Sequence, residues 1–75
     1  MKPNHLLTRL RQDIRKMASA PDEGGYLRYK KYATGKMLRL REHYRDKAMT
    51  VDDIEALKDC VQTFAEVRQA HDGKT

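Results

Sequence analysis

The stretch YLRYKKYATGKMLRLREHYRDK, residues 26–47, decides the fold. Its apolar and aromatic residues recur at spacings of three or four, at Tyr26, Tyr29, Ala33, Met37, Leu40 and Tyr44. An α-helix turns once in about 3.6 residues, so this spacing places them on one face. The stripe predicts a long amphipathic helix over about residues 26–46. Gly35 interrupts it at a cost of about 1 kcal/mol relative to alanine, and we expect it to mark the close approach of another backbone.

A second stripe of the same spacing precedes this stretch. It runs through Leu7, Leu10, Ile14 and Met17 and predicts a helix over about residues 4–18. Asn4 is the expected N-cap. Proline and paired glycines in residues 18–25, ASAPDEGG, predict a loop between the two helices.

The third stripe follows the quoted stretch. It runs through Ile54, Leu57, Val61 and Phe64 and predicts a helix over about residues 51–70. Thr50 is the expected N-cap. No alternation typical of strands occurs, so residues 1–75 are predicted to form one all-α domain, an antiparallel three-helix bundle.

The composition limits what stabilises such a domain. A chain of 75 residues buries only about 60% of the surface of its unfolded form, so its core is marginal. Cys60 is the single cysteine, which excludes an internal disulfide. His5, His43 and His71 are scattered without metal-ligand spacing. We therefore expect a partner to supply stability, and neither a cofactor of the chain's own nor a membrane span.

Charge is concentrated in the first two thirds of the chain. The net charge is +5, and residues 26–47 carry eight cations against two anions. Residues 1–20 carry five cations and one anion, a basic start that fits either mitochondrial targeting or an ordinary basic helix. Residues 50–75 hold three cations against six acids. The first two helices should therefore attract an acidic partner.

Three interpretations of these cations stay open. They form a solvated helix face, they bind RNA phosphates, or they hold an acidic protein that carries a phosphate ester. Tyr26, Tyr29 and Tyr44 lie on the apolar stripe, which favours a place in the core over stacking on RNA bases. No nucleophile, base or phosphate-binding loop is arranged for catalysis, and Cys60 lies on an apolar helix face, so we expect no enzyme.

The end of the second helix resembles the LYR-motif (Complex1_LYR) family. Residues 40–47, LREHYRDK, match the pattern Ile-Arg-x-x-Phe-Arg-x-Asn/Lys, with Arg41 and Arg45 in place and Tyr44 at the phenylalanine position. The acidic helix start in residues 50–57, TVDDIEAL, also fits. Residues 9–15, RLRQDIR, overlay the Leu-Tyr-Arg-x-x-Leu-Arg signature with Arg9 and Leu10 replacing its first two residues.

The resemblance implies a non-enzymatic adaptor of the mitochondrial matrix. Such adaptors bind mitochondrial acyl carrier protein, whose acyl-4'-phosphopantetheine inserts its acyl chain between the three helices. Carried over to this chain, the residues that grip the carrier and its phosphate are Arg11, Arg15, Lys36, Arg39, Arg41 and Arg45. The acyl groove or the core is formed by Leu10, Ile14, Met37, Leu40, Tyr44, Leu57, Val61 and Phe64, and the sequence does not separate these two uses.

The resemblance also suggests a destination for the pair. The shortest family members accompany the carrier on the maturing mitochondrial large ribosomal subunit, where the high charge would suit contact with ribosomal RNA. Respiratory complexes, ATP synthase and iron–sulfur assembly are the alternatives. A small basic RNA-binding helical module is the alternative from another class.

Overall fold

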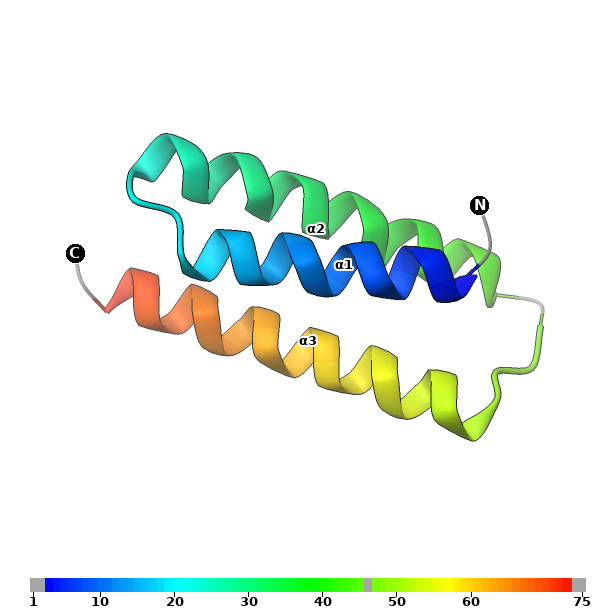
Figure 1. Cartoon of the computed structure of the whole chain (residues 1–75). Coiled ribbons are helices and arrows are strands. Elements are labelled where there is room, and N and C mark those ends of the chain that lie inside the picture. The colour runs from blue at the N-terminus through cyan, green and yellow to red at the C-terminus, as the bar shows by residue number, and fades with distance from the viewer. Residues whose placement is uncertain (1–2, 46, 74–75) are drawn as a thin grey trace.

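The computed structural model describes residues 3–45 and 47–73. It contains three helices, α1 (Pro3–Ala18), α2 (Glu23–His43) and α3 (Val51–Asp72), and no strand within the described residues. Each helix runs opposite to the preceding one (Figure 1). The predicted all-α three-helix bundle is confirmed.

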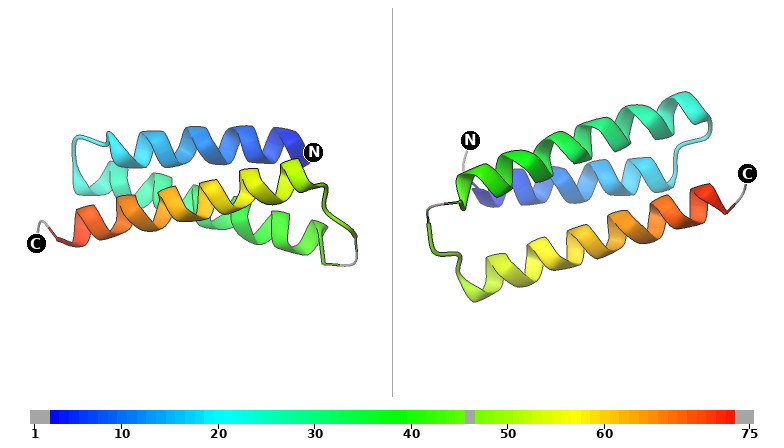
Figure 2. Two further views of the ribbon diagram at one scale, coloured as in Figure 1. Left: turned by 90° about the horizontal axis from the view of Figure 1, so that it is seen from below. Right: turned by 180° about the vertical axis from the view of Figure 1, so that it is seen from behind.

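Helix α1 is the central element of the bundle. It packs against α2 along its length and against α3, whereas α2 and α3 make far less contact with each other (Figure 2). Half of the buried apolar core comes from α1, namely Leu6, Leu7, Leu10, Ile14 and Met17. The other buried members are Tyr26, Ala33 and Leu40 of α2, and Cys60 and Phe64 of α3. Tyr29 and Tyr44 are partly buried against this core, as the stripe predicted.

The start of α2 differs from the prediction. The predicted loop extended to Gly25, but α2 begins at Glu23, because Asp22 caps it and accepts a hydrogen bond of 2.7 Å from the Gly25 N–H. The full entropy cost of glycine applies to a helix interior, and in this first turn the Asp22 cap satisfies the Gly25 N–H. The helix ends at His43 with Tyr44 as its C-cap, whereas we predicted residue 46, which lies outside the described residues.

The other termini are close to expectation. Helix α1 starts at Pro3, so Asn4 lies within the helix and does not precede it as a cap. Thr50 caps α3 as predicted, accepting a hydrogen bond of 3.1 Å from the Asp53 N–H. Helix α3 continues two residues beyond the predicted end, to Asp72, and Gly73 is its C-cap.

Gly35 does not mark a close approach, so that expectation was wrong. A Cβ atom at this position would meet no heavy atom within 4 Å, and no glycine in the described residues has a positive φ. Gly35 therefore lowers the stability of α2, and no close packing at this position offsets that cost.

Gly35→Ala is predicted to raise the free energy of unfolding by about 0.5–1 kcal/mol, because alanine loses less backbone entropy on forming a helix. Urea denaturation followed by circular dichroism measures the change. Gly25→Ala is the matched control, since its Cβ would lie 3.1 Å from the Asp22 carboxylate and disturb the cap. An increase in the free energy of unfolding for Gly25→Ala as large as that for Gly35→Ala would contradict this explanation.

Candidate functional site

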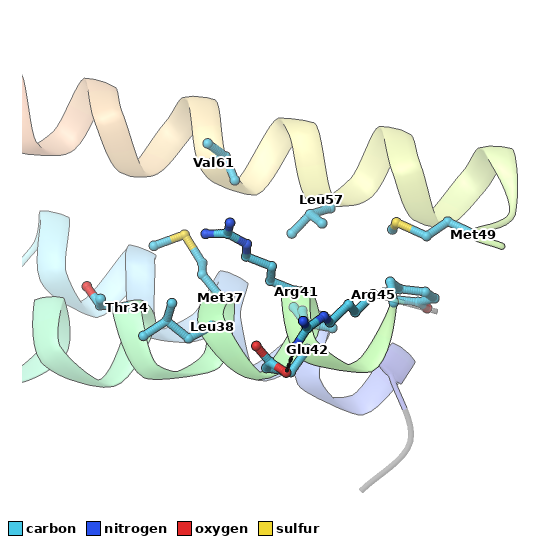
Figure 3. Close-up of a pocket in the computed structure, with 11 residues that line it drawn as sticks. Thr34, Met37, Leu38, Arg41, Glu42, Arg45, Met49, Leu57 and Val61 are labelled. Carbon is cyan, nitrogen blue, oxygen red and sulfur yellow. Dashed lines mark ion pairs between the residues drawn. The ribbon is translucent and has the colours of Figure 1, made fainter. Parts of the chain in front are cut away.

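A groove with a volume of about 920 Å³ lies between α2 and α3. It exists because both helices pack on α1 more than on each other. Figure 3 shows α2 side chains on one side of the groove and Leu57 and Val61 of α3 on the other. The full lining comprises Thr34, Met37, Leu38, Leu40, Arg41, Glu42, Tyr44, Arg45, Met49, Leu57 and Val61. We call this hollow the α2–α3 groove.

The floor and walls of the groove are mainly apolar. Met37 and Leu57 are partly buried, whereas Val61 keeps 47% of its surface exposed and Leu38 keeps 56%. Apolar side chains that remain exposed in a concave site favour an apolar ligand.

Two arginines lie at the groove. Arg41 and Arg45 project from the last turn of α2 and its C-terminal flank, and both are exposed. Figure 3 shows the Arg41 side chain extending from α2 into the gap between the helices. Arg45 lies 3.8 Å from the Glu42 carboxylate, but both side chains are about seven-tenths exposed, so this ion pair contributes little and leaves Arg45 able to bind an anion.

A hydrogen bond is formed by Tyr44, one of the residues that line the groove. The Tyr44 hydroxyl donates to an Asp53 carboxylate oxygen at 2.9 Å and so joins the end of α2 to the first turn of α3. Burial, and then this hydrogen bond, raise the pKa of Tyr44. The hydroxyl is therefore neutral and able to donate at physiological pH.

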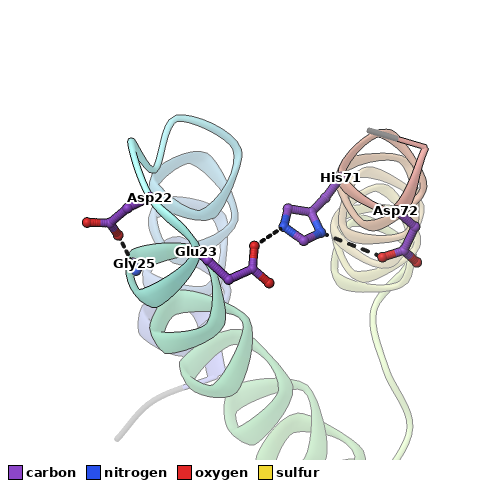
Figure 4. A network of polar contacts seen from close by, with 5 residues as sticks. All are labelled: Asp22, Glu23, Gly25, His71 and Asp72. Carbon is purple, nitrogen blue, oxygen red and sulfur yellow. Dashed lines mark hydrogen bonds and ion pairs between the residues drawn. The ribbon is translucent and has the colours of Figure 1, made fainter. Parts of the chain in front are cut away.

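The opposite ends of the two helices are also joined. Nε2 of His71 donates to the Glu23 carboxylate at 2.6 Å, and Nδ1 lies 3.6 Å from the Asp72 carboxylate (Figure 4). The His71 ring stacks on Tyr26 with ring centroids 3.6 Å apart. Polar contacts near both ends thus fix α3 relative to α2, while the groove between them stays open.

The structure separates the predicted apolar residues into two groups. Met37, Tyr44, Leu57 and Val61 line the groove, whereas Leu10, Ile14 and Phe64 belong to the core. Leu40 is fully buried in the core and also lines the groove. Leu38 and Met49 also line the groove but were not predicted. Leu38 lies off the apolar stripe, next to Met37, and this leucine beside the stripe was the signal that the sequence offered.

The six predicted basic residues do not form one cluster. Arg41 and Arg45 are at the groove. Arg11 and Arg15 line a small hollow of about 200 Å³ between α1 and α3. Lys36 pairs with Asp13 of α1 and is largely buried, and Arg39 is exposed but does not line the groove.

Cys60 lies beside the small hollow, with 1% of its surface exposed. Burial raises the pKa of its thiol, an effect that a hydrogen bond with Arg11 partly offsets. A buried thiol that is protonated at neutral pH is a packing residue and a poor nucleophile. The place of Cys60 in the core agrees with the sequence analysis.

Within residues 3–45 and 47–73, no three histidine, cysteine or acidic side chains gather into a group suited to a metal ion. None of the helices in this part combines the length and the apolar character needed to cross a membrane.

Comparisons with protein-family models, with curated proteins and with solved structures returned no match. The LYR resemblance stays a prediction.

Tyr44→Phe is predicted to lower the free energy of unfolding by about 0.5–1.5 kcal/mol, because Asp53 loses its hydrogen-bond donor. Tyr26→Phe removes the same hydroxyl group, but the Tyr26 hydroxyl is buried and has no hydrogen-bond partner within the described residues. It should leave stability unchanged or raise it by up to about 1 kcal/mol. Equal losses in the two variants, measured by urea denaturation, would contradict the assigned hydrogen bond.

Stability is also predicted to fall at high pH. Burial is the main cause that raises the pKa of both Tyr26 and Tyr44 above the ordinary value of 10.0. The folded state therefore holds these protons more tightly than the unfolded state. The resulting stabilisation is present below about pH 10 and is lost as the pH rises through the folded-state values. Denaturation at about pH 9 and about pH 11 should show a smaller fall for the double Phe variant than for the unmodified protein.

Proposed function

We propose that the protein is a non-enzymatic adaptor that binds acylated mitochondrial acyl carrier protein in the mitochondrial matrix. The acyl chain lies in the α2–α3 groove, and the arginines at the groove hold the phosphate of the carrier's phosphopantetheine and its acidic side chains. The observation that carries the proposal is an open, mainly apolar groove whose lining includes Arg41 and Arg45.

The energetics of the groove support an acyl chain as its occupant. Burying alkyl surface contributes about 0.8 kcal/mol per methylene. The walls include exposed apolar side chains such as Val61 and Leu38, which would also leave water on binding. A three-helix domain with few core residues on α3 gains stability from such a ligand, because any molecule that binds only the folded state shifts the folding equilibrium.

The charge arrangement supports a carrier protein over a free fatty acid. A free carboxylate needs one cation, whereas the groove has two exposed guanidinium groups, that of Arg41 in α2 and that of Arg45 in its C-terminal flank. Guanidinium groups bind phosphates and carboxylates through paired, charge-assisted hydrogen bonds. The proposal therefore assigns the principal grip to these two arginines, and secondary contacts at most to Arg11 and Arg15, which lie between α1 and α3.

We further propose that the pair docks onto the maturing mitochondrial large ribosomal subunit. The net charge of +5 supports a site near ribosomal RNA. Respiratory complexes, ATP synthase and the iron–sulfur machinery are the competing destinations. Mass spectrometry of proteins and RNA recovered with the tagged pair from mitochondria distinguishes them.

Co-expression with the carrier protein in acylated and non-acylated form, followed by pull-down and intact mass measurement, tests the carrier proposal. A one-to-one complex is expected with the acylated form, and Arg41→Glu with Arg45→Glu should abolish it. Arg28→Glu with Arg39→Glu makes the same charge change at exposed α2 positions outside the groove and should retain the complex.

A second pair of variants tests the groove without changing charge. Val61→Trp fills the groove and is predicted to weaken binding at least about tenfold, since the acyl chain loses its space. Leu27→Trp enlarges a half-exposed residue outside the groove and should bind as the unmodified protein does. Absence of a complex with either form of the carrier would refute the proposed function.

A further inference from the structure

A second surface of the bundle, formed jointly by α1 and α2, combines cations with an exposed aromatic ring. Lys16 of α1 lies over the Tyr29 ring at 5.6 Å from its centroid, and the Tyr29 and Tyr32 rings meet edge to face at 5.9 Å. Lys36 lies 5.8 Å from the Tyr32 ring centroid and pairs with Asp13 of α1. These contacts make a continuous surface across the two helices, which we call the α1–α2 face.

Helical spacing extends this face in both directions. Arg28, Tyr32, Lys36 and Arg39 follow one another at spacings of four, four and three, so they form a stripe on α2 about 17 Å long. Arg9 precedes Lys16 by seven residues and lies on the same side of α1. None of these residues lines the α2–α3 groove, so the face and the groove are separate.

The charge of the face is largely unneutralised. Arg9, Lys16, Arg28 and Arg39 are exposed, and no ion pair joins them to an acid within residues 3–45 and 47–73. The acid in contact with the face, Asp13, is buried and already paired with Lys36. Four exposed cations on one face attract a polyanion.

Tyr32 indicates which polyanion. Tyr32 keeps 47% of its surface exposed, and its ring contacts Tyr29 and Lys36. A fixed, exposed ring among cations is the arrangement on which single-stranded nucleic acids stack their bases while phosphates meet lysine and arginine. An acidic protein would use the cations but has no base to stack on Tyr32. A membrane surface would need apolar anchors, which the stripe lacks.

We propose that the α1–α2 face binds single-stranded nucleic acid, with a base stacked on Tyr32 and phosphates held by Arg9, Lys16, Arg28 and Arg39. RNA and single-stranded DNA share this chemistry, and the experiment separates them. The proposal does not depend on carrier binding, because it uses other side chains and another side of α2.

The test is fluorescence anisotropy of the full chain with labelled oligouridine, oligodeoxythymidine of equal length and duplex RNA. For single strands, log K falls with log salt at a slope of about −0.7 per phosphate contact, because bound counterions are released. Four contacts therefore predict a slope near −3. Single strands should bind more tightly than the duplex, whose stacked bases cannot reach Tyr32. Tighter binding of oligouridine than of oligodeoxythymidine would assign RNA as the natural ligand.

Four variants make the proposal falsifiable. Tyr32→Ala should weaken binding about tenfold without changing the salt slope, and Tyr32→Phe should restore it. Arg28→Gln with Arg39→Gln should reduce the slope by about 1.4, the share of two phosphate contacts. Arg41→Gln with Arg45→Gln removes the same charge at the groove and should retain the slope. All the changed residues are exposed, so each variant should fold, and circular dichroism checks this.

Four results would overturn the proposal. The first is equal loss of binding in the two double arginine variants, which would indicate attraction by net charge alone. The second is full binding by Tyr32→Ala, and the third is equal affinity for duplex and single strand. Absence of binding to every oligonucleotide would also overturn it and would direct the search to an acidic protein partner for this face.

Discussion

The apolar face of α1 packs against α2 on one side and α3 on the other, and the rest of the structure depends on this contact. Helix α1 supplies half of the buried apolar residues, whereas α3 contributes only Cys60 and Phe64 to them. Because each outer helix directs its core side chains toward α1, the sides that α2 and α3 turn toward each other are not fully covered. The groove is therefore a direct consequence of how the core is shared among the three helices.

The same arrangement gives α2 two chemically different sides. The side toward α3 has apolar walls and includes Arg41 and Arg45, whereas the side shared with α1 carries Tyr32 among exposed cations. The largely buried pair of Lys36 and Asp13 joins α1 to α2 and keeps this acid from neutralising the outer cations. The two proposed binding sites therefore use different side chains of one small bundle.

The fold was predictable from the sequence because periodicity alone places apolar residues on helix faces. The three stripes predicted all three helices, and Thr50 was a correct cap. The start of α2 was missed because Gly24 and Gly25 suggest a loop, while the strength of the Asp22 cap depends on a side-chain geometry that composition does not show. Gly35 was misjudged because nothing in a sequence tells whether a glycine faces a neighbour or open space.

The candidate site was less predictable, for a physical reason. Periodicity identifies the side of a helix that is apolar but not which part of that side a neighbouring helix covers. Leu10 and Val61 therefore looked equivalent, although Leu10 is buried in the core and Val61 lines the groove. The positive charge of α2 likewise looked like one cluster, but its members point to different sides of the helix: Arg41 to the groove, and Lys36 to Asp13 of α1.

The proposed binding of an acyl chain in the α2–α3 groove can be tested by isotope-filtered nuclear Overhauser spectroscopy of the complex with acylated carrier protein, using a labelled acyl chain. We expect contacts from the acyl methylenes to the side chains of Met37, Leu57 and Val61 but not to Ile14 in the core. Acyl contacts confined to the carrier protein's own side chains would contradict it.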